Sequence, residues 1–193
     1  MEERKVKEVF EVRIHGRAGQ GAKSGGQILA LAAFKEGKTI QAFPEYGSER
    51  RGAPTVAYTR ISEKEIRSHE PIVNPDAVIV LDDTLLYTIP VTKGLPDEGV
   101  LIVNTVKSPE EVRRITKFKG KIFTVDASGI SINNVGRDAP NVPSLGVLVK
   151  AYPFVKLESI ELAIKEIFEK KIGKEKTEAN IKALREAYKE AKS

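Results

Sequence analysis

The sequence predicts a three-layer α/β/α fold, in which a mostly parallel or mixed sheet opens with a Rossmann-like βαβ unit and ends in C-terminal helices. Two observations support this prediction. Continuous apolar runs at residues 77–81 and 99–103 are typical of parallel strands that are covered on both faces. Segments with helical spacing of apolar residues alternate with the strand-like segments, and such alternation indicates an α/β sheet.

Residues 9–43 form the predicted opening βαβ unit. Residues 9–15 alternate apolar and polar side chains and then run abruptly into glycine, which indicates a strand that ends at a sharp loop over residues 16–21. From residue 22 to residue 36 the apolar side chains follow helical spacing, and Gly37 ends the helix. Residues 39–43 are the second strand, so a right-handed crossover is expected between the two strands.

The middle of the chain predicts further strands and one well-marked helix. Residues 55–61 alternate well enough to form a strand, and residues 66–73 are expected to form a short extended piece that Pro71 interrupts. Ser108 marks a helix start, because proline follows it and Glu110 and Glu111 occupy the first turn. Residues 121–125 are the last predicted strand.

The C-terminal third is predicted to be helical. Residues 141–151 are typical of a buried helix, and residues 157–171 place their apolar side chains on one helical stripe that ends at Gly173. The final helix, residues 177–192, has a thinner stripe, so it either lies lightly on the body or reaches a partner chain. We expect residues 1–155 to form the α/β domain and residues 156–193 to form a helical extension packed on the same domain.

Composition excludes several classes of site. The 193 residues include no cysteine, so the chain has no disulfide, no thiolate zinc site and no cysteine-ligated iron–sulfur cluster of its own. The two histidines, His15 and His69, are too few for a typical transition-metal site. The net charge of +5 suits a phosphate-bearing ligand or an acidic partner better than duplex nucleic acid.

Composition also bears on location and source. No apolar run approaches the ~18 residues of a membrane span, and the first residues lack the apolar core of a signal peptide. We therefore expect a cytoplasmic protein. A single methionine, no cysteine and many Lys, Glu and Arg residues are typical of a thermophile.

The sharpest local feature is the glycine loop between the first strand and the first helix. Such a loop exposes backbone N–H groups at a helix N-terminus, where an anion such as phosphate is favoured. The spacing departs from the dinucleotide fingerprint G-x-G-x-x-G, and it departs from the P-loop because Ala22 precedes Lys23. The alternative, that the glycines only permit a tight turn, stays open. The candidate binding residues of the loop are Gly16, Arg17, Gly19, Gln20 and Gly21.

A charged turn at residues 44–54 supplies the second group of candidates, Glu49, Arg50, Arg51 and Gly52, with Glu45 beside them. Adjacent arginines in a turn can clamp a phosphate or carboxylate, or can reach an acid of a partner subunit. A solvated loop with local ion pairs is an equally weighted alternative.

The remaining polar residues do not assemble into a self-sufficient active site. His15 is expected to orient the glycine loop through its ring hydrogen bonds, and His69 is expected to be exposed or structurally bonded. Asp82, Asp83 and Asp126 follow predicted strands and are expected to be helix caps rather than a catalytic pair. No catalytic residue and no metal ligand is predicted.

Four segments together resemble the gamma subunit of 2-oxoacid:ferredoxin oxidoreductases, the pyruvate:ferredoxin oxidoreductase group in particular. They are residues 13–21 (RIHGRAGQG), residues 43–52 (FPEYGSERRG) with 55–62 after them, residues 66–71 (IRSHEP) leading to 75–82 (PDAVIVLD), and residues 141–151 (NVPSLGVLVKA). Their order and spacing make the match specific.

The resemblance implies a subunit of an enzyme that converts pyruvate, coenzyme A and oxidised ferredoxin to acetyl-CoA, carbon dioxide and reduced ferredoxin. It implies alpha, beta and delta partner subunits, with thiamine diphosphate, magnesium and iron–sulfur clusters on those partners. The chain itself lacks the thiamine diphosphate signature. Within this resemblance, the glycine loop and the Arg50/Arg51 pair are candidates for contacts with coenzyme A or with another subunit.

Three alternatives remain open at this point. One is a gamma-type subunit of a sister enzyme for branched-chain 2-oxoacids, 2-oxoglutarate or indolepyruvate, because nothing in this chain discriminates between these substrates. The second is a stand-alone nucleotide-binding module. The third is a purely architectural subunit that binds no small molecule.

Overall fold

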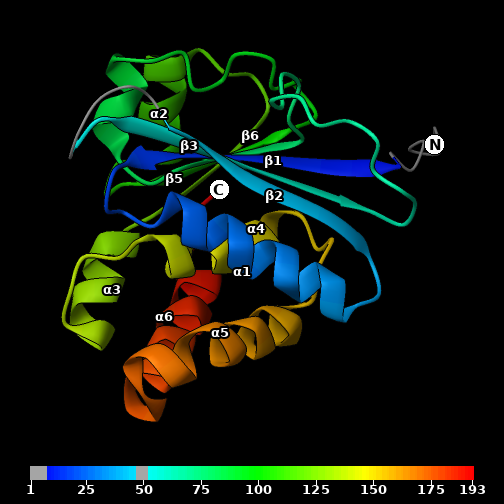
Figure 1. The fold of residues 1–193 in the computed structure, drawn as a ribbon. Helices are drawn as coiled ribbons and strands as arrows, with labels where there is room; N and C mark the ends of the chain where they lie inside the picture. Colours follow the sequence, from blue (N-terminus) through cyan, green and yellow to red (C-terminus); the bar gives the residue numbers. More distant parts are fainter. Residues whose placement is uncertain (1–7, 47–51) are drawn as a thin grey trace.

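A single six-stranded sheet forms the centre of the molecule in the computed structural model, which describes residues 8–46 and 52–193 (Figure 1). The strand order is β2-β3-β1-β4-β5-β6. The strands are β1 (Val9–Arg17), β2 (Thr39–Tyr46), β3 (Pro54–Ser62), β4 (Ala77–Val80), β5 (Val100–Asn104) and β6 (Lys121–Val125). The helices are α1 (Ala22–Lys35), α2 (Pro109–Thr116), α3 (Ala127–Val135), α4 (Asn141–Ala151), α5 (Leu157–Ile172) and α6 (Lys174–Glu190), with a 3₁₀ helix η1 (Asp83–Tyr87).

The sheet is mixed and mostly parallel, as predicted. β1, β4, β5 and β6 run parallel to one another, whereas β3 is antiparallel to both of its neighbours, β1 and β2. The prediction of a simple opening βαβ unit was therefore incomplete, since β1 and β2 do not pair. β3 returns antiparallel to β2 and lies between β2 and β1, so the crossover through α1 spans an inserted strand.

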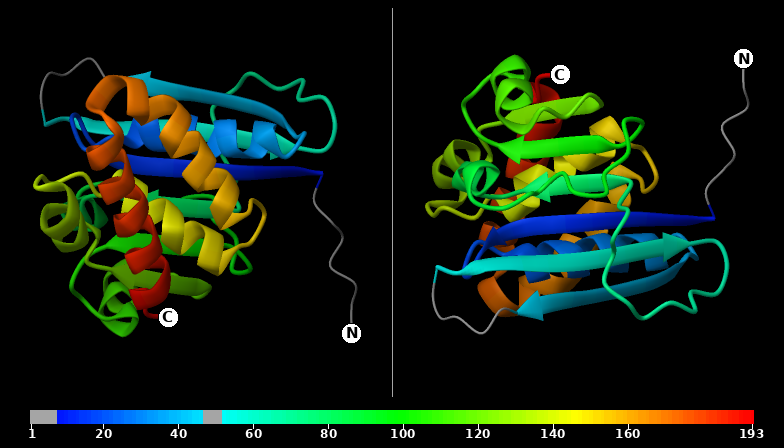
Figure 2. Two further views of the ribbon diagram at one scale, coloured as in Figure 1. Left: turned by 90° about the horizontal axis from the view of Figure 1, so that it is seen from below. Right: turned by 90° about the horizontal axis from the view of Figure 1, so that it is seen from above.

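Helices cover both faces of the sheet (Figures 1 and 2). On one face α1 lies against β1, β2 and β3, and α4 lies against β4, β5 and β6. Outside them, α5 packs on α1 and α6 packs on α4 and α3. On the other face η1, α2 and the segment between η1 and β5 cover the parallel half of the sheet. Each face has its own cluster of buried apolar side chains, so the parallel strands are apolar on both sides.

Most of the predicted elements are present, and the exceptions have local causes. The helix at 141–151 has the predicted bounds, and Gly173 ends α5. Residues 66–73 do not form a strand, and Pro71 within them removes a backbone donor that a strand would need. The short helices η1 and α3 were not predicted. Their N-caps are Asp82 and Asp126, so the prediction of helix caps is confirmed for these two residues, whereas Asp83, the third predicted cap, lies in the first turn of η1.

The last helix packs more closely than its thin apolar stripe indicates. A Cβ atom added to Gly146 in α4 would lie 2.3 Å from the carbonyl oxygen of Leu184 in α6, so the two backbones approach at the glycine. Ile181, Leu184 and Ala187 are buried there. After α6, the backbone of Lys192 pairs with Thr124 and covers the free edge of β6. The expectation of a light contact was wrong for α6.

Within residues 8–46 and 52–193, no helix combines the length and the apolar character that a membrane crossing requires.

Candidate functional site

The glycine loop lies at the carboxyl end of β1 and leads directly into α1. Gly19 has a φ angle of +105° and Gly21 a φ angle of +85°, a region that favours glycine. Gly21 has a second reason to be glycine, because an added Cβ atom would lie 2.6 Å from Cγ of Asn141, the first residue of α4. The Asn141 amide donates to the Ser24 hydroxyl at 3.1 Å, which in turn donates to the Gly21 carbonyl at 3.0 Å. α4 therefore holds the start of α1 in place.

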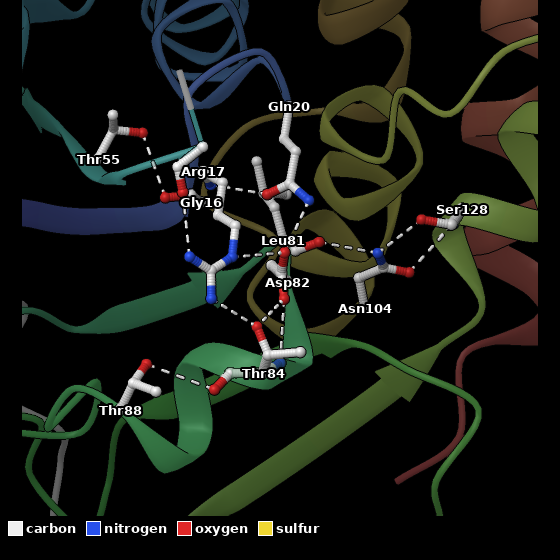
Figure 3. A network of polar contacts seen from close by, with 11 residues as sticks. Gly16, Arg17, Gln20, Thr55, Leu81, Asp82, Thr84, Thr88, Asn104 and Ser128 are labelled. Carbon is white, nitrogen blue, oxygen red and sulfur yellow. Dashed lines mark hydrogen bonds and ion pairs between the residues drawn. The ribbon is translucent and has the colours of Figure 1, made fainter. Parts of the chain in front are cut away.

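A network centred on Asp82, at the end of β4, holds the loop from the other side (Figure 3). One carboxylate oxygen of Asp82 accepts hydrogen bonds from Nε of Arg17 and Nε2 of Gln20, both at 3.1 Å. The other oxygen accepts from the Thr84 backbone N–H at 3.0 Å and from the Thr84 hydroxyl. Gln20 also accepts from the Arg17 backbone N–H at 2.7 Å. The loop is thus cross-linked to the neighbouring parallel strand.

The electrostatics of this network are internally balanced. Burial opposes the ionisation of Asp82, but hydrogen bonds from Thr84 and Gln20 and the charge of Arg17 outweigh it and lower the pKa of Asp82. The Arg17 guanidinium also donates to the Thr84 hydroxyl at 2.8 Å and to the Gly52 carbonyl at 3.0 Å. Arg17 and Gln20 were both predicted as site residues, but in the structure their side chains donate hydrogen bonds that position the loop.

The start of α1 keeps its anion-binding capacity. No side chain caps its first turn, and no acidic residue lies in that turn. A hollow of about 470 Å³ opens there, with Lys23 as a cation beside the first-turn backbone. Its lining comprises Arg17, Ala18, Gly19, Gly21, Ala22, Lys23, Ser24, Gln27, Ala53, Pro54 and Thr55. Backbone N–H groups, the helix dipole and an ammonium group together favour a phosphate or carboxylate in this hollow.

A second polar network extends along the same edge of the sheet, at the end of β5. The buried Asn104 donates to the Leu81 carbonyl and to the Ser128 hydroxyl, both at 2.9 Å, and accepts from the Ser128 backbone N–H at 3.0 Å. The Ser128 hydroxyl donates to Asp138 at 2.7 Å. Sequence reasoning missed Thr84, Ser128 and Asp138. Only for Thr84 was there a local signal, since a threonine two residues after an N-cap aspartate can offer both its N–H and its hydroxyl.

His15 does not act as predicted. Its side chain is 7% exposed, and neither ring nitrogen has a hydrogen-bond partner among the described residues. Burial, with a smaller contribution from the charge of Arg13, lowers the pKa of His15 to about 3. Only its backbone carbonyl reaches the site region, where it accepts from the Leu81 N–H at 2.8 Å. His69 is exposed and lies 2.8 Å from the Gln41 amide, as expected of a structurally bonded histidine.

The structure describes only part of the charged turn at residues 44–54. Glu49, Arg50 and Arg51 lie outside the described residues. Gly52 has a φ angle of +89° and supplies a carbonyl to Arg17, which brings the end of this turn beside the glycine loop. Glu45 accepts a hydrogen bond at 2.5 Å from the hydroxyl of Tyr58, which lies on β3. Among the described residues, no group of three or more His, Asp and Glu side chains could hold a metal ion.

The fold and the site together define an α/β protein that can hold an anion at a helix start and carries no thiolate-bound redox centre. The sequence matches the family described as pyruvate ferredoxin/flavodoxin oxidoreductase over residues 11–190. It is 50% identical over 187 residues to the pyruvate synthase subunit PorC of Thermotoga maritima, covering 97% of each chain. It is 51% identical to the pyruvate/ketoisovalerate oxidoreductases common subunit gamma of Thermococcus kodakarensis, covering 93% of this chain and 96% of the relative.

The architecture agrees with these sequence matches. The crystal structure of the pyruvate oxidoreductase subunit PORC from Thermotoga maritima superposes with a TM-score of 0.86 at 49% identity, and the match covers 96% of this chain and 98% of that one. The chain therefore belongs to the pyruvate ferredoxin/flavodoxin oxidoreductase family, in which it is a gamma subunit. This membership confirms the resemblance inferred from the four sequence segments, and it replaces the alternative of a stand-alone nucleotide-binding module.

Proposed function

We propose that this gamma subunit serves a complex that converts pyruvate, coenzyme A and oxidised ferredoxin to acetyl-CoA, carbon dioxide and reduced ferredoxin, and that its glycine loop binds a phosphate group of coenzyme A. The single observation that carries the second part is the uncapped start of α1 beside Lys23 in a hollow of about 470 Å³. Coenzyme A is the reactant of this set that carries phosphate groups. An uncapped helix start with an adjacent lysine is suited to such a group.

The redox and decarboxylation chemistry belongs to the alpha, beta and delta partner subunits in this proposal. Thiamine diphosphate with magnesium would supply the electron sink for decarboxylation, and iron–sulfur clusters would carry the electrons. The composition of this chain supports that division, because a cluster needs cysteine ligands and the sequence has none. The isolated chain is accordingly expected to be inactive, and the assembly is expected to be cytoplasmic.

A second substrate is a specific alternative. The relative from Thermococcus kodakarensis is named as a gamma subunit common to pyruvate and ketoisovalerate oxidoreductases, so one gamma chain can serve two enzymes. This chain would then join two different sets of partners. Assays of the purified complexes with pyruvate, 2-ketoisovalerate, 2-oxoglutarate and indolepyruvate would decide between a dedicated and a shared subunit.

The coenzyme A role is tested by Lys23→Ala in the assembled enzyme. Loss of a charge-assisted contact to phosphate is expected to raise the apparent KM for coenzyme A about tenfold, while the KM for pyruvate stays unchanged. Lys35→Ala is the matched control, because Lys35 lies at the other end of α1, where its ammonium pairs with Glu166. Lys35→Ala should leave both constants as they are.

Two results would contradict this role. An unchanged KM for coenzyme A in Lys23→Ala would remove the hollow as its binding site. A complex that loses subunits without a change in the coenzyme A constant would assign the hollow to subunit binding instead. Comparison with dephospho-coenzyme A adds resolution, since the effect of Lys23→Ala disappears with this analogue if Lys23 contacts the 3′-phosphate.

A further inference from the structure

A basic surface lies on α2 and the turn after it, away from the glycine loop. Five of the nine residues from 113 to 121 are basic and none is acidic. Four of these, Arg113, Arg114, Lys117 and Lys119, line a hollow of about 600 Å³ together with Glu110 and Phe118. We call these four residues the basic patch. The fifth, Lys121, lines a neighbouring hollow with Asp97 and Glu98, so acids balance its charge locally.

None of the four charges of the basic patch forms a close ion pair with a carboxylate among the described residues. All four residues are exposed, and none forms an ion pair with any acid in the part of the chain that the structure describes. Several other basic residues are paired, among them Arg17, Lys107 and Arg185. Glu111, the nearest acid along the helix after Glu110, is committed to the capping box with Ser108. Glu110 in the same hollow and the nearby Glu111 offset part of this charge, so the patch presents a net positive field to solvent.

The patch is also rigid at its base. The Arg113 guanidinium donates to the Phe118 carbonyl at 2.8 Å and to the Gly120 carbonyl at 3.0 Å, which fixes the turn after α2. Lys117 holds the left-handed C-cap position with a φ angle of +57°, and its N–H donates to the Arg113 carbonyl at 2.9 Å. Because the backbone under the cations is already fixed, this chain would lose little conformational entropy when a partner binds.

The chemistry of the patch favours a transient partner over a permanent one. Lysine is depleted from the cores of stable interfaces, which are built on exposed apolar and aromatic side chains. Here the one aromatic residue, Phe118, is 6% exposed, so the surface offers charge rather than apolar area. Surfaces of this kind accelerate and orient reversible encounters with a partner of opposite charge.

We propose that the basic patch docks a small acidic electron-carrier protein reversibly. The proposal rests on the proposed function, whose last step reduces such a carrier. This chain transfers no electron itself, because the electrons pass from clusters held by partner subunits to the carrier. The basic patch would attract and orient the carrier. It lies on α2 and on the turn at the amino end of β6, whereas the glycine loop lies at the carboxyl end of β1.

The experiment uses the assembled oxidoreductase carrying Lys117→Glu/Lys119→Glu, with ferredoxin from the source organism as the probe. At about 0.02 M salt, where the Debye length is about 20 Å, the KM for ferredoxin is expected to rise about fivefold to tenfold. At about 0.5 M salt the difference from wild type should vanish. Reduction of a small viologen dye with pyruvate and coenzyme A should be unaffected, because a dye needs no docking surface.

Lys170→Glu/Lys171→Glu is the matched control. These two exposed lysines lie in the last turn of α5, outside the hollow, and neither forms an ion pair among the described residues. Both double variants therefore place two added acids at or just after a helix C-terminus, where negative charge is unfavourable. A ferredoxin KM within twofold of wild type in the patch variant, or an equal rise in the control, would overturn the proposal.

Two further outcomes are informative. Loss of subunits from the patch variant would make the patch a permanent interface and would also refute the docking role. Failure of the wild-type complex to reduce the dye with pyruvate would instead refute the proposed function, and the docking role with it.

Discussion

Asp82→Asn is the sharpest test of how the glycine loop is held. Every group that contacts the Asp82 carboxylate is a donor: Nε of Arg17, Nε2 of Gln20, and the N–H and hydroxyl of Thr84. An asparagine offers one acceptor oxygen and turns an NH₂ group toward the remaining donors. The Asp82 side chain is only 16% exposed, so water replaces the lost contacts poorly. Hydrogen bonds to charged groups contribute about 1.5–3 kcal/mol each, and we expect a net loss of about 2–3 kcal/mol.

Thermal unfolding measures this loss. For a chain of this length about 2–4 °C corresponds to 1 kcal/mol, so Asp82→Asn should lower Tm by roughly 4–12 °C at pH 7. Asp83→Asn is the control: Asp83 pairs with the partly exposed Lys107, and asparagine can still accept from Thr105, so the cost should stay below about 1 kcal/mol. A Tm for Asp82→Asn equal to that of Asp83→Asn would refute the reasoning.

The pH dependence of stability in the same variant tests whether folding lowers the pKa of Asp82. The pKa of Asp82 is lowered in the folded state, so its contribution to stability is present above the unfolded pKa of about 3.9 and is lost as the pH falls through the folded value. The difference in unfolding free energy between wild type and Asp82→Asn should therefore become smaller below about pH 4. A difference that widens on acidification would contradict the assignment of the charged form.

Two other predictions concern the same end of the sheet. In Gly21→Ala the new Cβ atom would lie 2.6 Å from Cγ of Asn141, and the φ angle is also unfavourable for alanine. Gly37→Ala is the control, because Gly37 has a similar φ angle of +80° but open space around it. Guanidinium denaturation should therefore show a larger loss of unfolding free energy for Gly21→Ala than the roughly 1 kcal/mol expected for Gly37→Ala. His15, with a pKa lowered to about 3, stays neutral in the folded chain while the unfolded chain protonates below about pH 6.5. Wild type should therefore lose stability between about pH 6.5 and pH 4. His15→Leu should lose less stability over that range. An equal slope of unfolding free energy against pH in the two proteins would show that His15 titrates normally.

Local patterns predicted the elements because the signals for them are local. Apolar runs located β4 and β5, and helical spacing located α4 and α5 to within a residue or two. The Ser108 capping box follows directly from the residues that surround it. Sheet order was not predictable in the same way. Whether β2 pairs with β1 or with β3 depends on contacts between segments that are distant in the sequence, and periodicity does not record that choice.

The candidate site shows the same division. Glycine spacing and strand ends indicated which residues gather at the carboxyl edge of the sheet, because the ends of parallel strands meet there. The role of each side chain did not follow. Arg17 was a candidate ligand residue, yet its guanidinium pairs with Asp82, 65 residues away in the sequence. His15 was expected to form hydrogen bonds at the loop, yet its ring is enclosed without a partner among the described residues.

The sequence by itself determined that this gamma subunit carries no cysteine-bound cluster, that its sheet is largely parallel, and that a glycine loop precedes its first helix. These properties depend on residue identity and on short-range periodicity. Only the tertiary structure decided that β3 is inserted between β2 and β1, that Asp82 accepts hydrogen bonds from both Arg17 and Gln20, and that Lys23 lies beside the uncapped helix start. Such facts depend on contacts between distant segments, and these contacts form only when the whole core closes.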